Sequence, residues 1–214
     1  MNINVGYDFD EPIYPWNDLA HTASIKGGLC KRGTPRPVSW APYEEYGCTA
    51  EEWYAVIDNE ILHGDMYLQP INRRLVEEMR RFYNRGYNIH IITSRGNFGP
   101  LGEQIKQITK SGLIRDGVPY TTLNFTKDKV PVALELGLDY MVDDHPKYHD
   151  PLTAAGINSF LLDAPYNQEH PEKWHPHGNR VKDVFQYMKI IMDNHGRPGD
   201  MTPAQKAHVQ PSTL

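Results

Sequence analysis

Short apolar segments alternate along this chain with longer segments that carry a helical pattern of apolar residues. The apolar segments, each long enough for one strand, are residues 3–7, 88–96, 119–125, 140–146 and 157–163. The helical segments are residues 69–87, 99–113, 129–139 and 180–196. Strands that alternate with helices favour a parallel sheet with right-handed crossover connections. The pattern therefore predicts an α/β fold built on a parallel sheet.

One segment, residues 16–66, interrupts this alternation directly after the first strand. Residues 26–47 are rich in glycine and proline and predict a loop. Residues 49–62 predict a helix, with Thr49 at its N-cap and Glu52 completing a capping box. We therefore expect a small, mainly helical cap inserted after the first strand.

This reading divides the chain into three parts. Residues 1–15 and 67–196 are expected to form the core, and residues 16–66 the cap insertion. Residues 197–214 are polar and hold several prolines, so we expect a disordered tail.

Composition narrows the function classes. The chain has 214 residues and a formal net charge of -5, which does not suggest general nucleic-acid binding but permits a small phosphorylated substrate.

Its two cysteines, Cys30 and Cys48, form no CxxC pair, so a structural zinc site is poorly supported. They would pair only in an oxidising compartment, and free thiols are the simpler reading. No apolar run is long enough to span a membrane, and no signal peptide precedes the first strand. We expect a soluble, cytoplasmic protein.

Polar side chains follow three of the predicted strands at the point where each strand ends. They are Asp8 and Asp10 after the first strand, Thr93 and Ser94 after the second, and Asp143 and Asp144 after a later one. In parallel α/β sheets, ligands bind at the carboxyl ends of the strands. The three clusters therefore predict a site at that edge of the sheet.

The pair Asp8 and Asp10 raises an electrostatic question. Residues two apart on extended backbone share a face, and adjacent carboxylates repel unless a metal ion, a cationic side chain or a shared proton neutralises them. Mg²⁺ prefers such oxygen ligands and keeps a carboxylate nucleophile ionised. Asp8 is then placed to attack, and Asp10 to donate and accept a proton. A hydroxyl from Thr93 or Ser94 and a nearby lysine complete what phosphoryl transfer requires.

At this point the sequence resembles a known family. "DFD" after one strand, "IITS" after a second, a lysine at a helix start and "DD" after a later strand are similar to the four motifs of haloacid dehalogenase (HAD)-type phosphatases. The resemblance extends over about residues 3–167. "TSRG", "KVPVALELGLDYMVDDHP" and "APYN" are more closely similar to segments of 5'-nucleotidases that act on deoxyribonucleotides, including bacterial and phage-type members. The resemblance implies a Rossmann-like core, Mg²⁺ as cofactor, an aspartyl-phosphate intermediate and a 5'-(deoxy)nucleotide substrate.

The resemblance also implies roles for single residues. Asp8 would be the nucleophile and a metal ligand, and Asp10 the general acid/base and a metal ligand through its carbonyl. Lys129 would be the lysine of the third motif, with Lys127 as the alternative. Asp144 would bind the metal, with Asp143 as a further ligand or a near neighbour. Phosphate would be bound by Thr93, Ser94 and Arg95, with capping of its loop as the alternative role of Arg95.

Some questions stay open at this stage. The family usually has glycine after its second aspartate, where this chain has Glu11 and Pro12, so the geometry of that turn is in doubt. The cap aromatics would stack on a base or form the core of the cap; they are Trp16, Trp40, Tyr43, Tyr46, Trp53 and Tyr54. Another phosphomonoester substrate, a catalytically idle binding protein and a homodimer all remain compatible with the sequence. A bacterial or phage-infected host cytoplasm is the expected location.

Overall fold

The computed structural model describes residues 3–97 and 99–196. The predicted disordered tail, residues 197–214, lies outside the described residues. Within them, six strands form one sheet in which every neighbouring pair is parallel. The predicted α/β fold with a parallel, Rossmann-like sheet is therefore confirmed.

The strands lie in the order β3-β2-β1-β4-β5-β6. Their bounds are β1 Asn4–Tyr7, β2 Asn88–Thr93, β3 Thr122–Phe125, β4 Tyr140–Asp143, β5 Asn158–Leu162 and β6 Arg180–Val181. The chain moves from β1 outward to β3 on one side, and from β4 outward to β6 on the other. The boundary between β1 and β4 is thus the place where the strand order reverses, which is where open α/β sheets bind ligands.

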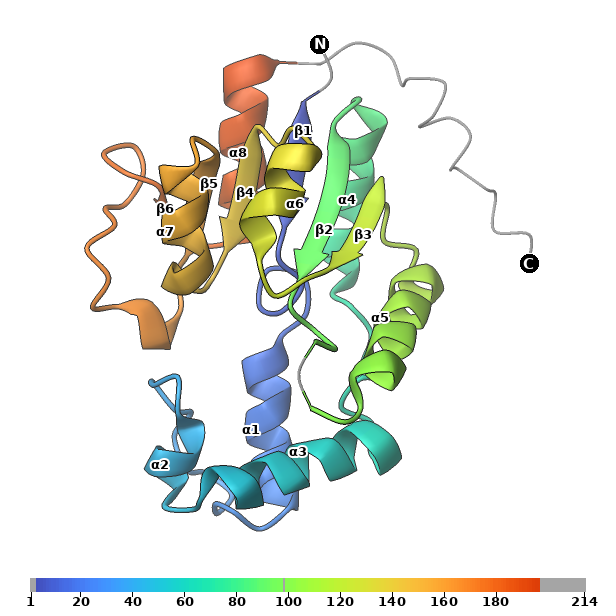
Figure 1. Cartoon of the computed structure of the whole chain (residues 1–214), viewed down its shortest axis with the longest axis vertical. Helices are drawn as coiled ribbons and strands as arrows, with labels where there is room; N and C mark the ends of the chain where they lie inside the picture. The colour runs from blue at the N-terminus through green and yellow to red at the C-terminus, as the bar shows by residue number, and fades with distance from the viewer. Residues whose placement is uncertain (1–2, 98, 197–214) are drawn as a thin grey trace.

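Helices cover both faces of the sheet (Figure 1). On one face α6 (Lys129–Glu135) and α7 (Pro146–Ala154) pack against the central strands around Ile92 and Met141. On the other face α4 (Arg73–Asn84) and α8 (Val184–His195) cover Val5 and Tyr7. Helix α5 (Gly102–Asp116) adds Ile105 and Leu113 to that second cluster. Fully buried parallel strands explain why the strand segments are almost continuously apolar.

Three helices lie between β1 and α4 in the sequence and beyond the carboxyl edge of the sheet (Figure 1). They are α1 (Trp16–Lys26), α2 (Pro42–Tyr46) and α3 (Ala50–His63). The capping box predicted for α3 is present, because Thr49 accepts from the Glu52 amide and the Glu52 carboxylate accepts from the Thr49 amide. The buried residues Trp53 and Ile57 of α3 belong to the same contiguous apolar cluster as the sheet, so these helices share a core with it.

Several elements differ from the predicted ones. Helix α4 begins at Arg73 rather than near Pro70, because the Asn72 side chain accepts from the amides of Arg74 and Leu75. The segment predicted as a loop contains α2, and α1 was not predicted at all. The closing helix predicted over residues 180–196 begins only at Val184, where the Asp183 side chain caps it, and Arg180–Val181 form β6 instead. Helix α7 and the short 3-10 turn Pro165–Asn167 were not predicted.

The cysteines and the lengths of the helices bear on two further expectations. Cys30 and Cys48 are free thiols, as expected. In the part of the chain that the structure describes, no helix has the length and apolar character that crossing a membrane requires.

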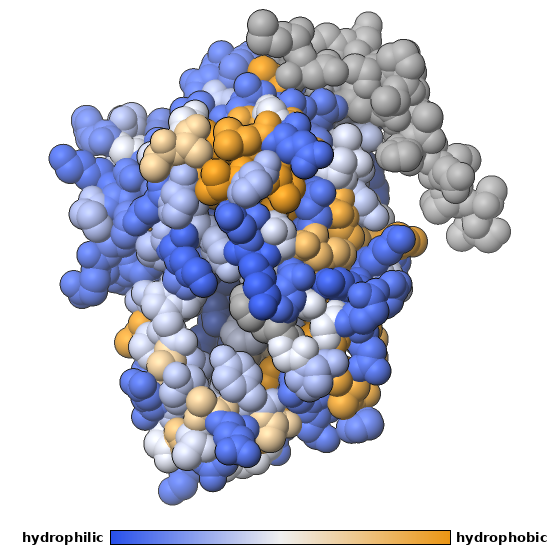
Figure 2. All heavy atoms as spheres, in the orientation of Figure 1, coloured by the Kyte–Doolittle hydropathy of each residue, from blue (hydrophilic) through white to orange (hydrophobic). Residues whose placement is uncertain are grey.

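The surface seen in Figure 2 is mainly hydrophilic, with an apolar area over α6, where Leu134 is exposed.

Candidate active site

Three carboxylates meet where the strand order reverses. Asp8 follows β1, Asp143 ends β4, and Asp144 follows it; one oxygen from each lies within 4.8 Å of the others. The backbone brings them together because the Asp8 amide donates to the Val142 carbonyl at 2.9 Å, which continues the pairing of β1 with β4. All three side chains are buried. We call these three residues the acid cluster.

Lys129 is the cation that contacts this cluster. Its ammonium donates to Asp8 Oδ1 and to Asp143 Oδ2, each at 2.6 Å. Asp128 caps the start of α6 and so fixes where Lys129 leaves the helix. The ammonium also lies 4.2 Å from the ring centre of Tyr148, which gives a cation–π contact. The alternative lysine, Lys127, is exposed.

The ionisation of the cluster is governed by burial. Burial raises the pKa of the Asp8 carboxyl to about 7, although the charge of Lys129 lowers it. Burial and the charges of Asp143 and Asp8 raise the pKa of Asp144 well above its usual range. Burial lowers the pKa of Lys129, but the charges of Asp143 and Asp8 outweigh it and the pKa is raised. One lysine therefore does not compensate all three carboxylates, and a bound cation would favour their ionised form.

Asp144 has partners that the sequence did not identify. Tyr166 donates to Asp144 Oδ2 at 2.6 Å, and the side-chain amide of Asn167 donates to the Asp144 carbonyl at 2.8 Å. Both residues belong to the "APYN" segment, whose likeness to the nucleotidases does not by itself assign a role to any of its residues. That segment was the available signal for them.

Thr93 and Ser94 lie at the carboxyl end of β2, the strand beside β1. Thr93 is buried, and its hydroxyl accepts from the Arg95 amide at 3.1 Å. Ser94 is only partly buried. Both residues thus lie at the same sheet edge as the acid cluster.

Asp10 and Arg95 form a separate pair beside the acid cluster. Arg95 Nη2 donates to Asp10 Oδ1 at 2.5 Å, and Arg95 Nε donates to the same oxygen at 3.1 Å. The Arg95 side chain is 4% exposed and that of Asp10 is 30% exposed. The Arg95 guanidinium is therefore occupied by Asp10 in this structure.

The turn after Asp10 answers the question raised by the missing glycine. Glu11 has a φ of 67°, in the left-handed region that favours glycine. Its carboxylate accepts from the Asn17 amide at 2.7 Å, in the first turn of α1. Burial raises the pKa of Glu11 to about 7. The turn keeps a glycine-like backbone, and the glutamate side chain ties it to the first helix of the insertion.

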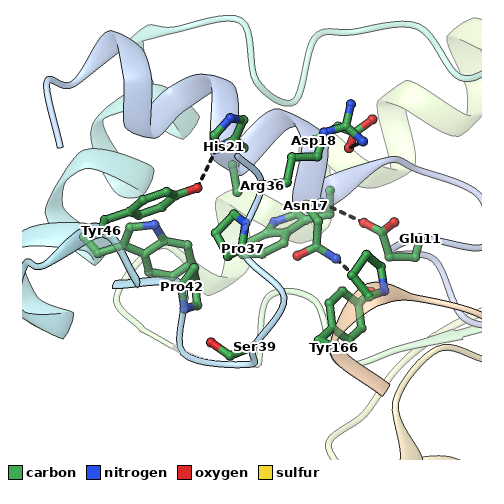
Figure 3. Close-up of a pocket in the computed structure, with 14 residues that line it drawn as sticks. Glu11, Asn17, Asp18, His21, Arg36, Pro37, Ser39, Pro42, Tyr46 and Tyr166 are labelled. Carbon is green, nitrogen blue, oxygen red and sulfur yellow. Dashed lines mark hydrogen bonds and ion pairs between the residues drawn. The ribbon is translucent and has the colours of Figure 1, made fainter. Parts of the chain in front are cut away.

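A pocket of about 580 Å³, its mouth included, lies between this turn and α1–α3 (Figure 3). Its aromatic and proline walls are Trp16, Trp53, Tyr46, Tyr166, Pro37, Pro42 and Pro165, and its polar lining includes Glu11, Asn17, Asp18, His21, Arg36 and Ser39. The surface in Figure 2 is hollowed between the sheet and these helices. Tyr166 lines the pocket and also donates to Asp144, so the pocket adjoins the acid cluster.

The polar groups of the pocket are largely paired with one another. The Asn17 side-chain amide donates to the Tyr166 hydroxyl at 2.8 Å, and His21 Nδ1 lies 2.6 Å from the Tyr46 hydroxyl (Figure 3). Arg36 and Asp18 form an ion pair at 2.5 Å. The pocket is thus an aromatic- and proline-walled space whose polar groups form an ordered hydrogen-bond network.

Trp40 joins the insertion to the other side of the site. Its ring stacks on His145 with centres 3.8 Å apart and lies 4.0 Å from the ring centre of Tyr166. Glu45 holds this loop by accepting from the Val38 and Ser39 amides. Two of the aromatic residues of residues 16–66 contribute to the core. Trp53 is buried in the apolar cluster, and the ring of Trp16 packs against the ring of Trp53 with centres 5.9 Å apart.

No protein-family model matches this chain, and a comparison with curated proteins finds no relative. Its structural neighbours include hydrolases of the HAD superfamily. The hydrolase YfnB of Bacillus subtilis, solved bound to magnesium, matches with a TM-score of 0.54 at 10% identity over 89% of this chain and 98% of its own. A predicted phosphoglycolate phosphatase from Haemophilus somnus matches with a TM-score of 0.53 at 15% identity over 89% and 98%. A haloacid dehalogenase-like hydrolase from Streptococcus pneumoniae matches with a TM-score of 0.51 at 8% identity over 96% of each chain. At these identities the likeness shows a shared fold.

Proposed function

We propose that the chain is a Mg²⁺-dependent phosphomonoesterase that works through an aspartyl-phosphate, with a 5'-(deoxy)nucleotide as its substrate. The observation that carries the proposal is the acid cluster, with three carboxylates from β1 and β4 within 4.8 Å. The HAD-like fold of its neighbours and the magnesium bound to one of them support the same assignment.

The residues of the cluster fit a magnesium ion. Carboxylate and carbonyl oxygens are the ligands that Mg²⁺ prefers, and mutual repulsion makes a cation favourable here. Asp8, Asp144 and the carbonyl of Asp10 would hold the ion, with Asp143 as a further ligand or as the partner of Lys129. When bound, the ion would neutralise negative charge on the carboxylates and on the phosphoryl oxygens.

The chain's own residues would then carry the two chemical steps. An Asp8 oxygen attacks phosphorus, the bond to the leaving oxygen breaks, and Asp10, which enters this step protonated, gives its proton to that oxygen. Water next attacks phosphorus, Asp10 takes the proton from the water, and the bond to Asp8 breaks. The sum is phosphomonoester plus water giving alcohol plus phosphate, with both aspartates restored.

Groups that are already positioned around Asp8 would offset the negative charge in both steps. The Lys129 ammonium, 2.6 Å from Asp8, offsets charge on the nucleophile and on the transferring group. The hydroxyls of Thr93 and Ser94 would donate to phosphoryl oxygens. Such positioning is most of what phosphoryl transfer demands of a protein.

The substrate assignment rests on the pocket beside the acid cluster. Its flat aromatic walls and its amide and imidazole groups suit a nucleoside better than an aliphatic leaving group. In this proposal residues 16–66 act as the cap over the leaving group, and residues 1–15 and 67–196 as the core. The likeness of the "TSRG" and "APYN" segments to nucleotidases points the same way.

Phosphate release from a panel of phosphomonoesters tests the proposal. The panel should hold 5'-mononucleotides with ribose and deoxyribose, sugar phosphates and an oligonucleotide with a terminal phosphate. Wild-type protein with Mg²⁺ should release phosphate fastest from the mononucleotides, and Asp8→Asn should lower kcat by a factor of about 10³ or more. Asp193→Asn, at an exposed residue of α8, is the control that should keep the wild-type rate. Equal rates for wild type and Asp8→Asn would refute the mechanism, and no preference for nucleotides would refute the substrate.

A further inference from the structure

Arg95 lies inside a cage of three aromatic rings. Its guanidinium carbon is 4.1 Å from the ring centre of Tyr67, 4.4 Å from that of Phe9 and 4.8 Å from that of Tyr14. Burial lowers the pKa of this arginine, but the charge of Asp10 outweighs it, so the group stays charged. Cation–π attraction holds a desolvated cation among ring faces more strongly than it holds an exposed one.

Two of the three rings of this cage come from the segments that join residues 16–66 to the rest of the chain. Tyr14 belongs to residues 11–15, the entry linker, and Tyr67 to residues 64–72, the exit linker. The Tyr14 hydroxyl donates to the Met66 carbonyl at 2.6 Å, which ties the linkers together. Trp16 Nε1 donates to the Tyr67 hydroxyl at 3.3 Å, which ties the exit linker to α1.

The same guanidinium fixes the side chain of Asp10. It reaches Asp10 Oδ1 through Nε and Nη2, and its remaining nitrogen, Nη1, donates to Thr109 on α5 at 3.3 Å. A planar guanidinium bound on one edge and enclosed on its faces has little freedom to rotate. The position of the Asp10 carboxylate is therefore linked to the position of both linkers.

We propose that Arg95 is a positioning residue that couples the two linkers to the orientation of the Asp10 carboxylate. This inference rests on the proposed function, in which Asp10 is the proton donor and acceptor. A change in the angle of the insertion moves Tyr14 and Tyr67, shifts the guanidinium they enclose, and so moves Asp10 relative to Asp8. Arg95 acts through Asp10 and does not itself contact the substrate.

A purely structural role for Arg95 predicts something different. In that case the ion pair would only stabilise the linkers, and losing Arg95 would lower stability without a specific effect on turnover. The two roles are separated by a cycle of variants measured for kcat and KM with a 5'-mononucleotide: Arg95→Met, Asp10→Asn and the two combined. Arg73→Lys, at an exposed arginine of α4, is the matched control.

We expect Arg95→Met to lower kcat by a factor of about 10 to 100 and to change KM by less than about threefold, since a small displacement of a catalytic group costs about that much. In protein that already carries Asp10→Asn, Arg95→Met should cause no further loss of kcat. Multiplying losses, or a change confined to KM, would overturn the proposal. Arg95→Lys keeps the charge but not the fork, and it should recover only part of kcat.

Milder variants at Tyr67 test the cage even if Arg95→Met does not fold. Tyr67→Leu removes one ring of the cage and leaves the ion pair, whereas Tyr67→Phe keeps the ring. Tyr67→Leu should lower kcat several-fold at unchanged KM, and Tyr67→Phe should stay within about twofold of wild type. Equal kcat for the two variants would count against the cage.

Hydrogen exchange tests the coupling without any activity measurement. In Arg95→Met, the amides of Glu11 and Tyr14 in the entry linker and of Leu68 in the exit linker should exchange at least about tenfold faster. The amide of Trp53, inside α3, should keep its wild-type rate. Unchanged exchange in both linkers would overturn the coupling, and this result stands even if the wild type releases no phosphate, which would refute only the proposed function.

Discussion

The residues that matter most to this protein are charged and buried. Asp8, Asp143 and Lys129 are each less than a tenth exposed, and the lysine contacts both carboxylates. Removing one partner of a buried ion pair leaves an uncompensated charge, which costs far more than the pair itself contributes. The site therefore makes the folded state depend on a few side chains that are placed for chemistry.

Lys129→Met should lower the free energy of unfolding by about 3–5 kcal/mol in the absence of metal, because Asp8 and Asp143 lose their cation. Denaturant unfolding followed by circular dichroism measures the change. Lys110→Met, at an exposed lysine of α5, is the control and should stay within about 0.5 kcal/mol of wild type. A loss of less than about 1 kcal/mol for Lys129→Met would mean that the two carboxylates are not charged in the folded protein.

At the scale of elements, the turn between β1 and α1 combines strain with a specific contact. Glu11 adopts a left-handed backbone that costs a non-glycine residue about 1–2 kcal/mol, and its carboxylate holds the Asn17 amide. The strain and the contact can be separated because glycine removes both, whereas alanine removes only the contact.

Glu11→Ala should therefore be less stable than Glu11→Gly by about 1 kcal/mol. The difference between the two midpoints in urea gives this value directly, since both variants lack the bond to Asn17. Equal midpoints would show that the left-handed backbone at residue 11 relaxes once the carboxylate is gone.

The start of α3 offers a second test at this scale. Thr49→Ala removes the side chain that accepts from the Glu52 amide, and it should cost about 1 kcal/mol. Because Trp53 and Ile57 of α3 share the apolar cluster of the sheet, the loss should appear in the single unfolding transition of the whole protein. A separate, earlier transition in a thermal scan would instead mean that α1–α3 unfold on their own.

The elements that the sequence predicted are those with a strong local signal. Buried parallel strands are continuously apolar, and α3 and α4 carry apolar stripes with caps or stops. Helix α7 was not predicted because Pro146 and Pro151 interrupt its helical pattern. Strand β6 was not predicted because it has only two residues. Helix α1 was not predicted because no side chain caps its first turn.

The same reasoning applies to the site. The strand-end acids followed from position along the chain, since parallel strands bring their carboxyl ends to one edge. Lys129 followed only from the resemblance to the family's third motif. The contact of Arg95 with Asp10 and that of Tyr166 with Asp144 join residues 85 and 22 positions apart. Such pairings depend on how the loops fold over the sheet edge, and no local pattern encodes them.

At the scale of the whole molecule, stability should depend on pH with a sign set by the buried acids. The pKa of Asp8 and that of Glu11 are raised to about 7, and that of Asp144 is raised too, so the folded protein binds protons more tightly than the unfolded chain. Stability from these groups is present at low pH and is lost as pH rises through about 7. His90 and His149 have lowered pKa values, so they act in the opposite direction, but only below about pH 6.5.

Magnesium should reverse the loss above that pH. Metal ligands must be deprotonated, so Mg²⁺ competes with the protons on Asp8 and Asp144 and binds more tightly as pH rises. A ligand that binds only the folded state stabilises it by an amount that grows with its affinity. Without metal, Tm should fall between about pH 6.5 and pH 8.5, and millimolar Mg²⁺ should raise Tm more at the upper pH than at the lower. Asp144→Asn should remove most of this magnesium effect and, because it also removes a repelling charge, should raise the metal-free Tm at the upper pH. A magnesium effect that is the same at both pH values, or that survives in Asp144→Asn, would place the ion away from the acid cluster.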